Sequence, residues 1–375
     1  MAGIYIHIPF CKQRCSYCDF YTRVAPLQVE KTVAAIAQEA VQRKTYLQNA
    51  KIQTIYFGGG TPSLLSSSQF KLIFDAIFQN YNVELNAEIT FEANPDDLTP
   101  EFFEELKSLP FNRISMGIQS FDSVQLKAIN RRHSGDEAVL AFQNARKAGF
   151  QNVSVDLIYG LPGQSLQSWE QQLSTALQLQ PEHISIYGLT YESGTPLHKQ
   201  RELGRVQCVS DDDMIAMHVH TITTTTNAGY EAYEISNFAR PGFRSQHNSA
   251  YWKMTPYLGL GPSAHSFNGD TRCWNVESIK DYVKAIDEGQ TYIEYETLTA
   301  LNKYNEYVMV ALRTSEGVNT SYLEQNFDST ILNHFYTQLQ AFEGDNVLIY
   351  KDNFIRLTLE GILISNIIIE RFIIV

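Results

Sequence analysis

Three of the five cysteines of the chain fall within eight residues, in the stretch HIPFCKQRCSYCDF. Cys11, Cys15 and Cys18 have the spacing C-x-x-x-C-x-x-C, in a predicted loop directly after a predicted strand. Such a loop can wrap one small metal centre, since thiolates are the ligands of iron–sulfur clusters. Three thiolates on a four-iron cube leave one iron open to a chelating small molecule. The rival interpretations are a Cys3His zinc site, with His7 as the fourth ligand, and chance proximity.

Further stretches whose side chains could take part in chemistry follow the later predicted strands. The stretches are YFGGGTPS, EITFEANP, RISMGIQSF, INRRH and VDLIYGLPGQ, in that order. Glycine lets a backbone approach a ligand closely, because it has no Cβ.

These groups lie on a regular alternation of strands and helices. Apolar periodicity predicts strands over 3–8, 52–57, 88–93, 113–118, 153–158 and 183–189, with helices between them. Six βα units with buried strands predict a parallel sheet covered by helices, as a complete barrel, a partial barrel or an open sheet. Because the polar stretches follow the strands, they favour a barrel with its site at the carboxyl ends.

The pattern changes near residue 200. Ser210 is predicted to cap a helix that ends at Gly229, residues 229–267 are predicted as strand and loop, and a hairpin is expected to turn at Asp352-Asn353. Thr358 is a predicted cap for the last helix. The sequence therefore predicts three parts, 1–200, 201–296 and 297–375.

Charge and apolar patterning exclude some functions. The formal net charge of −12 argues against nucleic acid as a general partner. No signal peptide is expected at the start, and the late apolar stretch ILISNIIIERFIIV is too short and too interrupted for a transmembrane segment. We expect a cytoplasmic protein, whose clustered thiols bind metal rather than form disulfides. Cys208 and Cys273 stand alone and are expected to pack in the interior.

The C-x-x-x-C-x-x-C loop resembles the signature of the radical S-adenosylmethionine (SAM) superfamily, and the ordered stretches resemble its HemN/HemW family over nearly the whole chain. The resemblance implies an α/β fold: a partial, six-unit βα TIM-type barrel with a smaller C-terminal α+β domain. It implies a [4Fe–4S] cluster on Cys11, Cys15 and Cys18, with SAM on the open iron. It also implies SAM contacts at Tyr5, Gly59, Gly60, Thr61, Glu92, Gln119, Arg131 and Asp156. Under this resemblance, Glu92 suits the SAM ammonium group, Arg131 its carboxylate, and Asp156 a ribose hydroxyl or the positive ligand.

The family has an oxidase branch and a haem-chaperone branch, and two features favour the second. The oxidase carries a fourth cysteine two residues after the third, where this chain has Phe20. The stretch HNSAYW, 247–252, matches the H-N-x-x-Y-W sequence of the chaperone branch. The resemblance makes His247, Tyr251 and Trp252 candidate haem contacts. The alternative is that Tyr251 and Trp252 pack between domains while His247 bonds a carbonyl group.

The expected function is that of a haem chaperone that carries haem as cargo to acceptor proteins, plausibly respiratory haemoproteins, and takes electrons from a donor. The first alternative is oxygen-independent coproporphyrinogen III oxidation, a radical decarboxylation, which Phe20 disfavours. Whether the chain is an enzyme therefore stays open. A second alternative is a structural zinc protein. Covalent attachment of haem to Cys208 or Cys273 also stays open.

Overall fold

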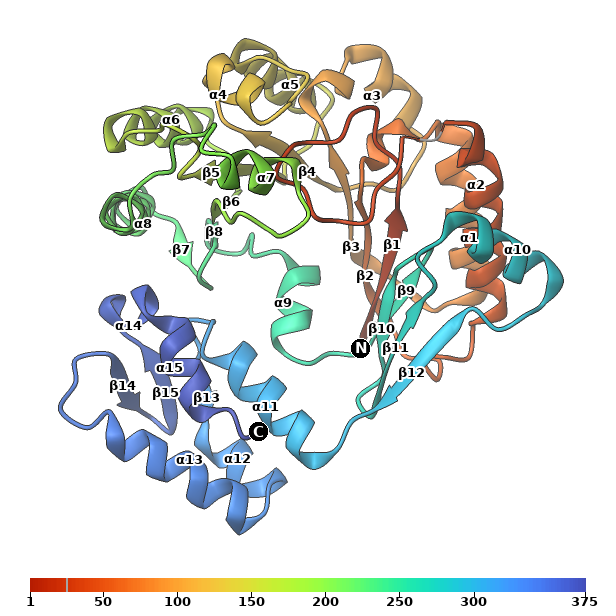
Figure 1. Ribbon diagram of the computed structural model, residues 1–375. Helices are drawn as coiled ribbons and strands as arrows, with labels where there is room; N and C mark the ends of the chain where they lie inside the picture. The colour runs from red at the N-terminus through yellow and green to blue at the C-terminus, as the bar shows by residue number, and fades with distance from the viewer. Residues whose placement is uncertain (25) are drawn as a thin grey trace.

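The computed structural model describes residues 1–24 and 26–375, and its centre is a single large sheet. Six parallel strands pair in chain order in the middle of this sheet (Figure 1). They are β1 (Ala2–Ile8), β2 (Ile52–Gly59), β3 (Val83–Ala93), β4 (Arg113–Gln119), β5 (Val153–Tyr159) and β6 (His183–Gly188). The predicted parallel βα core is confirmed.

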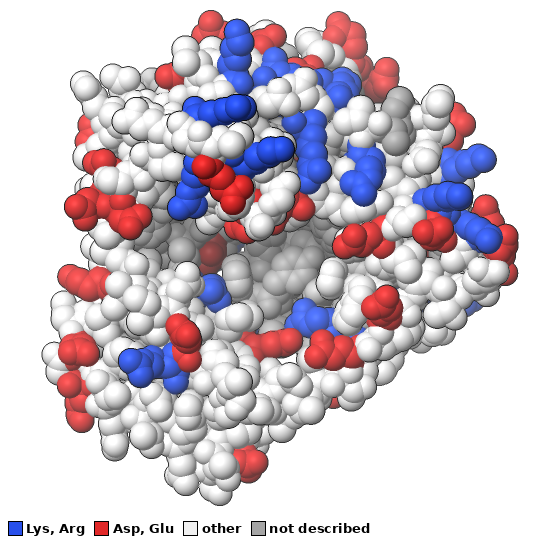
Figure 2. Space-filling model, viewed as in Figure 1, with Lys and Arg blue, Asp and Glu red and all other residues white. Residues whose placement is uncertain are grey.

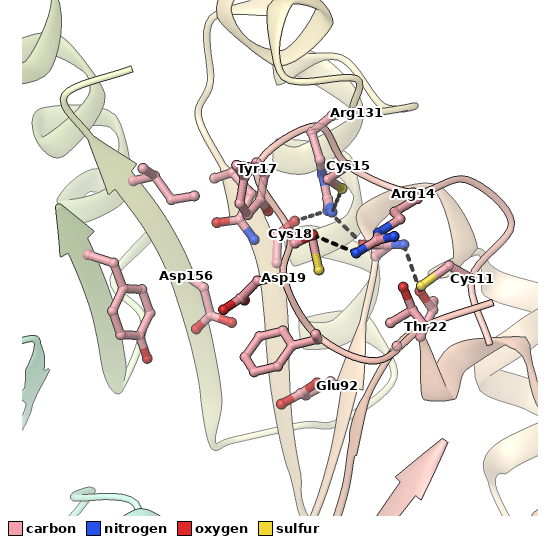
Figure 3. Close-up of a pocket in the computed structure, with 18 of the residues that line it drawn as sticks. Cys11, Arg14, Cys15, Tyr17, Cys18, Asp19, Thr22, Glu92, Arg131 and Asp156 are labelled. Carbon is pink, nitrogen blue, oxygen red and sulfur yellow. Dashed lines mark hydrogen bonds between the residues drawn. The ribbon is translucent and has the colours of Figure 1, made fainter. Parts of the chain in front are cut away.

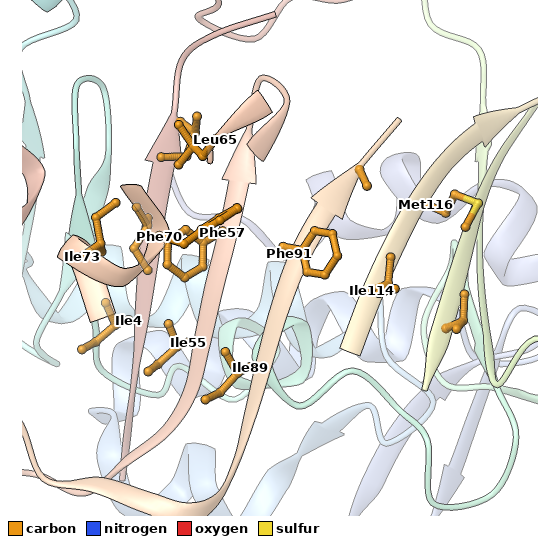
Figure 4. Close-up of a cluster of buried hydrophobic side chains, with 14 of the residues drawn as sticks. Ile4, Ile55, Phe57, Leu65, Phe70, Ile73, Ile89, Phe91, Ile114 and Met116 are labelled. Atoms are coloured by element: carbon orange, nitrogen blue, oxygen red, sulfur yellow. The ribbon is translucent and has the colours of Figure 1, made fainter. Parts of the chain in front are cut away.

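Helices cover the outer face of these strands. They are α1 (Val29–Gln42), α2 (Ser67–Asn80), α3 (Pro100–Leu106), α4 (Ser123–Ala128), α5 (Gly135–Lys147) and α6 (Leu166–Leu179), with 3-10 turns at Pro26–Gln28, Pro62–Leu64 and Pro95–Asp97. Phe57 on β2 packs edge-on against Phe70 and Phe74 of α2, and the strands beside it contribute aliphatic side chains (Figure 4). Each such buried side chain stabilises the fold by about 1.5–3 kcal/mol.

The opposite face of the six strands is polar. Register places Thr54 beside Glu88, Thr90 beside Arg113, and Asp156 beside Ser185. Asp156 is half-buried and the other five residues are buried. Since successive strand residues point to opposite faces, the alternate apolar residues face the helices and these polar residues face the inside of the partial barrel. The barrel interior is therefore lined by hydrogen-bonding and charged side chains.

The segment after residue 195 extends the sheet at both edges. Its elements are α7 (Pro196–Glu202), α8 (Asp211–Asn227), β7 (Glu231–Ala232), β8 (Asn237–Ala239), α9 (Gln246–Trp252), β9 (Tyr257–Leu260), β10 (His265–Phe267), β11 (Thr271–Asn275), α10 (Ile279–Glu288) and β12 (Ile293–Thr297). Strand β8 pairs antiparallel with β6, whereas β9 pairs parallel with β1. The barrel is thus open between β1 and β6, and the segment 201–296 shares its sheet.

Two details of this segment test the sequence-based expectations. Ser210 caps α8 by accepting from the Asp213 N–H, as predicted. The prediction of strand and loop over 229–267 is wrong for 246–252, which form the helix α9. Its first N–H groups are satisfied by the Glu88 carboxylate, far away in the sequence, so local patterning does not reveal it.

The C-terminal part has a hydrophobic core of its own (Figure 1, blue). It consists of α11 (Ala300–Ala311), β13 (Val318–Asn319), α12 (Thr320–Asn326), α13 (Ser329–Ala341), β14 (Leu348–Lys351), β15 (Phe354–Leu357), α14 (Leu359–Leu363) and α15 (Ser365–Phe372). The hairpin turns at Asp352 and Asn353, both with positive φ, as predicted. Thr358 caps α14, but the predicted last helix is divided into α14 and α15.

The predicted fold class, a partial βα barrel with a smaller C-terminal α+β domain, is confirmed. In the described part of the chain, none of the helices combines the length and the apolar character that a membrane crossing requires.

Candidate functional site

The three clustered cysteines line one pocket at the carboxyl ends of the barrel strands. The pocket has a volume of about 590 Å³ and is lined by the loop after β1, the glycine turn after β2, and the ends of β3 to β6. The thiols of Cys11, Cys15 and Cys18 are free and partly exposed. The loop therefore presents all three sulfur atoms to the same space (Figure 3).

Hydrogen-bond donors surround the thiols. Arg131 Nη1 lies 3.4 Å from Cys15 Sγ, and Thr61 Oγ1 lies 3.4 Å from Cys11 Sγ. Arg14 donates to the Cys18 carbonyl oxygen at 3.1 Å. Burial raises the pKa of Cys11 and raises the pKa of Cys18 to about 11. The neighbouring donors compensate the negative charge that the thiols acquire when they bind a metal.

The alternative zinc interpretation needs His7 as its fourth ligand, and the structure shows this side chain engaged elsewhere. His7 Nδ1 bonds Tyr5 Oη and Nε2 bonds the Tyr21 carbonyl. Within residues 1–24 and 26–375, no three His, Cys, Asp or Glu side chains are gathered as ligands of a single metal ion.

The glycine turn after β2 forms one wall of the pocket. Gly59 has φ +104°, a conformation that favours glycine, and a Cβ on Gly60 would lie 2.6 Å from the Phe10 carbonyl oxygen. The backbone of the turn therefore lies directly against the cysteine loop. The Gly60 and Thr61 N–H groups bond the Ile8 and Phe10 carbonyls, which fixes the two segments together.

Two half-buried acidic residues, Glu92 on β3 and Asp156 on β5, face the pocket. Glu92 accepts from Tyr56 Oη at 2.9 Å and from the Gly59 N–H at 3.1 Å. Burial raises the pKa of Glu92 to about 7. Asp156 accepts from Ser115 at 3.2 Å, and burial raises its pKa as well. A cation in the pocket would favour the ionised form of both groups.

Most of the predicted SAM contacts gather in this pocket. Its lining includes Gly59, Gly60, Thr61, Glu92, Gln119, Arg131 and Asp156. Tyr5 is different, because its ring lies beside the stacked rings of Tyr56 and His247 in the barrel interior, and it is not among the lining residues.

Comparisons with known proteins identify the family of this chain. Residues 5–175 match the radical SAM superfamily, and residues 298–364 match the HemN C-terminal domain. The chain is 34% identical to the Bacillus subtilis "Heme chaperone HemW" over 99% of both chains, and 32% identical to that of Lactococcus lactis over 98% of this chain and 96% of the relative. This chain belongs to the HemW family.

The HemW family assignment agrees with the fold. The Escherichia coli coproporphyrinogen III oxidase HemN, a radical SAM enzyme, superposes with a TM-score of 0.85 at 25% identity, covering 99% of this chain and 90% of that one. The radical SAM superfamily implies a [4Fe–4S] cluster and SAM. Three thiols with cationic neighbours, a glycine wall and two half-buried carboxylates in one pocket fit both groups.

The HemW motif H-N-x-x-Y-W forms α9 and lies away from this pocket. His247 Nδ1 lies 2.7 Å from Thr54 Oγ1, and Nε2 lies 2.9 Å from Tyr251 Oη. Burial lowers the pKa of His247 to about 3, with Arg113 as a second cause. Both ring nitrogens are thus engaged inside the barrel. The Trp252 indole N–H is buried without a partner among the described residues.

The other two cysteines of this HemW-family chain differ from each other. Cys273 is buried, as expected, and its Sγ lies 3.3 Å from Arg43 Nη2. The expectation that Cys208 packs in the interior is wrong, because it is exposed on the segment between α7 and α8.

Sequence reasoning missed Arg113 on β4. Its side chain is fully buried, and its three guanidinium nitrogens find no hydrogen-bond partner in the part of the chain that the structure describes. The nearest carboxylate is that of Glu88, at 4.0 Å. A signal was available in RISMG, VSVD and HISIY, where polar residues alternate with apolar ones in strands that helices cover.

Proposed function

We propose that this chain is a haem chaperone that binds a [4Fe–4S] cluster, SAM and haem, and delivers haem to acceptor proteins. The observation that carries the proposal is the pocket in which Cys11, Cys15 and Cys18 meet the predicted SAM contacts, with Phe20 where the oxidase branch has a cysteine. Relatives that bear the name "Heme chaperone HemW" match along nearly the whole chain, which supports haem as the cargo.

Within this proposal, each group of the pocket has a role. Cys11, Cys15 and Cys18 would hold three irons of the cluster, and the fourth iron would be left for SAM. When bound, the cluster would supply single electrons for the cleavage of SAM. Glu92 would accept a hydrogen bond from the SAM ammonium group near the glycine wall, Arg131 would orient the SAM carboxylate, and Asp156 would bond a ribose hydroxyl or face the cationic sulfur. The proposal includes an electron donor and haem acceptors such as respiratory haemoproteins. It places the protein in the cytoplasm, because the thiols must stay reduced.

The second candidate is coproporphyrinogen III oxidation, which the structural likeness to HemN favours. Anaerobically reconstituted protein separates the two. Iron, sulfide and haem are quantified after haem titration, and a parallel sample receives coproporphyrinogen III, SAM and reductant. Stoichiometric haem binding without turnover supports the chaperone. Formation of protoporphyrinogen IX would establish the oxidase, and zinc without iron or sulfide would reject both.

A further inference from the structure

One side of the pocket holds none of the predicted SAM contacts. Tyr187 and Gly188 at the end of β6, Leu189 and Thr190 after it, and Ser236 before β8 line this side. Figure 2 shows that this face of the molecule is hollowed near its middle, with charged side chains around the hollow. The pocket lining therefore extends beyond the residues that are predicted to bind SAM.

Two aromatic side chains stand partly in solvent at this pocket. Phe20, in the cysteine loop, is 64% exposed, and Tyr187, on β6, is 43% exposed. Both belong to the pocket lining. Exposed aromatic surface that lines a pocket is characteristic of a binding site, because covering it by a flat apolar ligand releases its hydration water. We call the pocket surface around Phe20 and Tyr187 the pocket mouth.

The cysteine loop also carries an uncompensated cation. Lys12 pairs with Asp97 at 2.6 Å and Arg132 pairs with Asp96 at 2.7 Å. Arg14 lines the pocket, is exposed, and forms no ion pair with a carboxylate of the described chain. In Figure 3, Arg14 lies toward Cys11, whereas Asp19 lies toward Asp156. The pocket therefore has a cationic side and an acidic side, which would orient a ligand whose carboxylates are on one edge.

We propose that haem binds at the pocket mouth, with its macrocycle against Phe20 and Tyr187 and its propionates toward Arg14. This inference rests on the proposed function and replaces His247 as the centre of the haem site. Haem has the required chemistry, a flat apolar ring with two carboxylates on one edge. Bound there, it lies beside the cysteine loop, and the part beyond the mouth stays accessible to an acceptor.

The test uses full-length, anaerobically reconstituted protein, titrated with haem and with haem dimethyl ester, whose propionates are blocked. Phe20→Ala should weaken haem binding about tenfold, and Phe20→Trp should restore it, because a flat ring is what the site needs. Arg14→Gln should weaken haem binding about tenfold, whereas Asp19→Asn should strengthen it. The dimethyl ester should abolish both charge effects. Tyr350→Ala, at an equally exposed aromatic residue on β14, is the matched control.

Haem affinities are compared at matched iron content, because Arg14 neighbours the cysteines. SAM affinity, measured by equilibrium dialysis, should stay unchanged in Phe20→Ala and Phe20→Trp. If Phe20→Ala and Arg14→Gln bind haem as the wild type does, the proposed haem position is wrong. If Phe20→Ala weakens SAM binding but not haem binding, Phe20 serves SAM and the inference also fails. If the wild type itself binds no haem, the proposed function fails and this inference falls with it, so the two failures are distinguishable.

Discussion

Arg113 Nε lies 4.0 Å from Glu88 Oε2 inside the barrel, and both side chains are almost completely buried. The same carboxylate accepts the backbone N–H groups of Gln246 and His247, each at 3.0 Å. Glu88 therefore does two things: it compensates the buried charge of the Arg113 guanidinium, and it anchors the start of α9. One carboxylate thus joins β3, β4 and the H-N-x-x-Y-W helix.

Glu88→Gln should lower the free energy of unfolding by about 3 kcal/mol, since it leaves Arg113 buried without its counter-charge. Urea denaturation followed by circular dichroism measures the change. Exposed Glu105→Gln on α3 is the control and should shift the unfolding midpoint little. An unchanged midpoint for Glu88→Gln would show that another group compensates Arg113.

Glu92 should make the stability of the cofactor-free protein depend on pH. Because burial raises its pKa to about 7, the folded chain holds this proton more tightly than the unfolded chain does. The resulting stabilisation is complete below about pH 4.5 and is lost as pH rises through about 7. The side chain in Glu92→Gln stays neutral at every pH. The free energy of unfolding of this variant, relative to that of the wild type, should therefore rise by on the order of 3 kcal/mol between pH 5 and pH 8. Urea denaturation of both proteins across this pH range tests the prediction. It would be contradicted if the unfolding free energies of wild type and variant changed in parallel with pH.

Arg131→Met should weaken SAM binding about ten- to hundredfold, because a charge-assisted hydrogen bond to the SAM carboxylate is lost. The guanidinium is held by Asn94 Oδ1 at 2.7 Å and lies against Cys15. Equilibrium dialysis at matched iron content measures the change. Arg132→Gln is the neighbouring control, since Arg132 pairs with Asp96 outside the pocket lining and should leave SAM affinity as it is. Equal affinities for wild type and Arg131→Met would remove Arg131 from the SAM site.

His247→Ala should destabilise the protein by about 2 kcal/mol, because it leaves the Thr54 and Tyr251 hydroxyls without their shared partner. The haem absorption spectrum should not change. Thermal unfolding and spectroscopy of the same preparation measure both, with exposed His265→Ala as the control. A changed spectrum with unchanged stability would instead identify His247 as an iron ligand.

The sequence predicted those parts of the fold that local interactions determine. Helix α5 is one of the helices predicted between the strands, and it begins at Gly135 because Ser134 and Glu137 form a capping box at its start. The hairpin at Asp352-Asn353 was equally predictable, since both residues tolerate positive φ. The resemblance likewise predicted most of the residues that gather around the cysteines, because most of them lie at the carboxyl ends of strands or after them.

Features that depend on distant contacts could not be predicted in the same way. Helix α9 is seven residues long, and the carboxylate that satisfies its first N–H groups comes from Glu88, 158 residues from Gln246. Tyr5 follows the strand alternation, but only the position of α9 shows that its ring packs toward His247 rather than lining the pocket. The exposure of Cys208 likewise depends on how α7 and α8 are joined.

The open edge between β1 and β6 has a mechanical consequence. A complete barrel is closed by hydrogen bonds between its first and last strands, so it cannot widen without breaking them. Here the two edges are linked by the chain that runs from β8, next to β6, through α9 to β9, next to β1. The barrel can therefore widen or narrow by bending its twisted sheet, with every strand pair intact. A bulky flat ligand could then enter and leave without local unfolding.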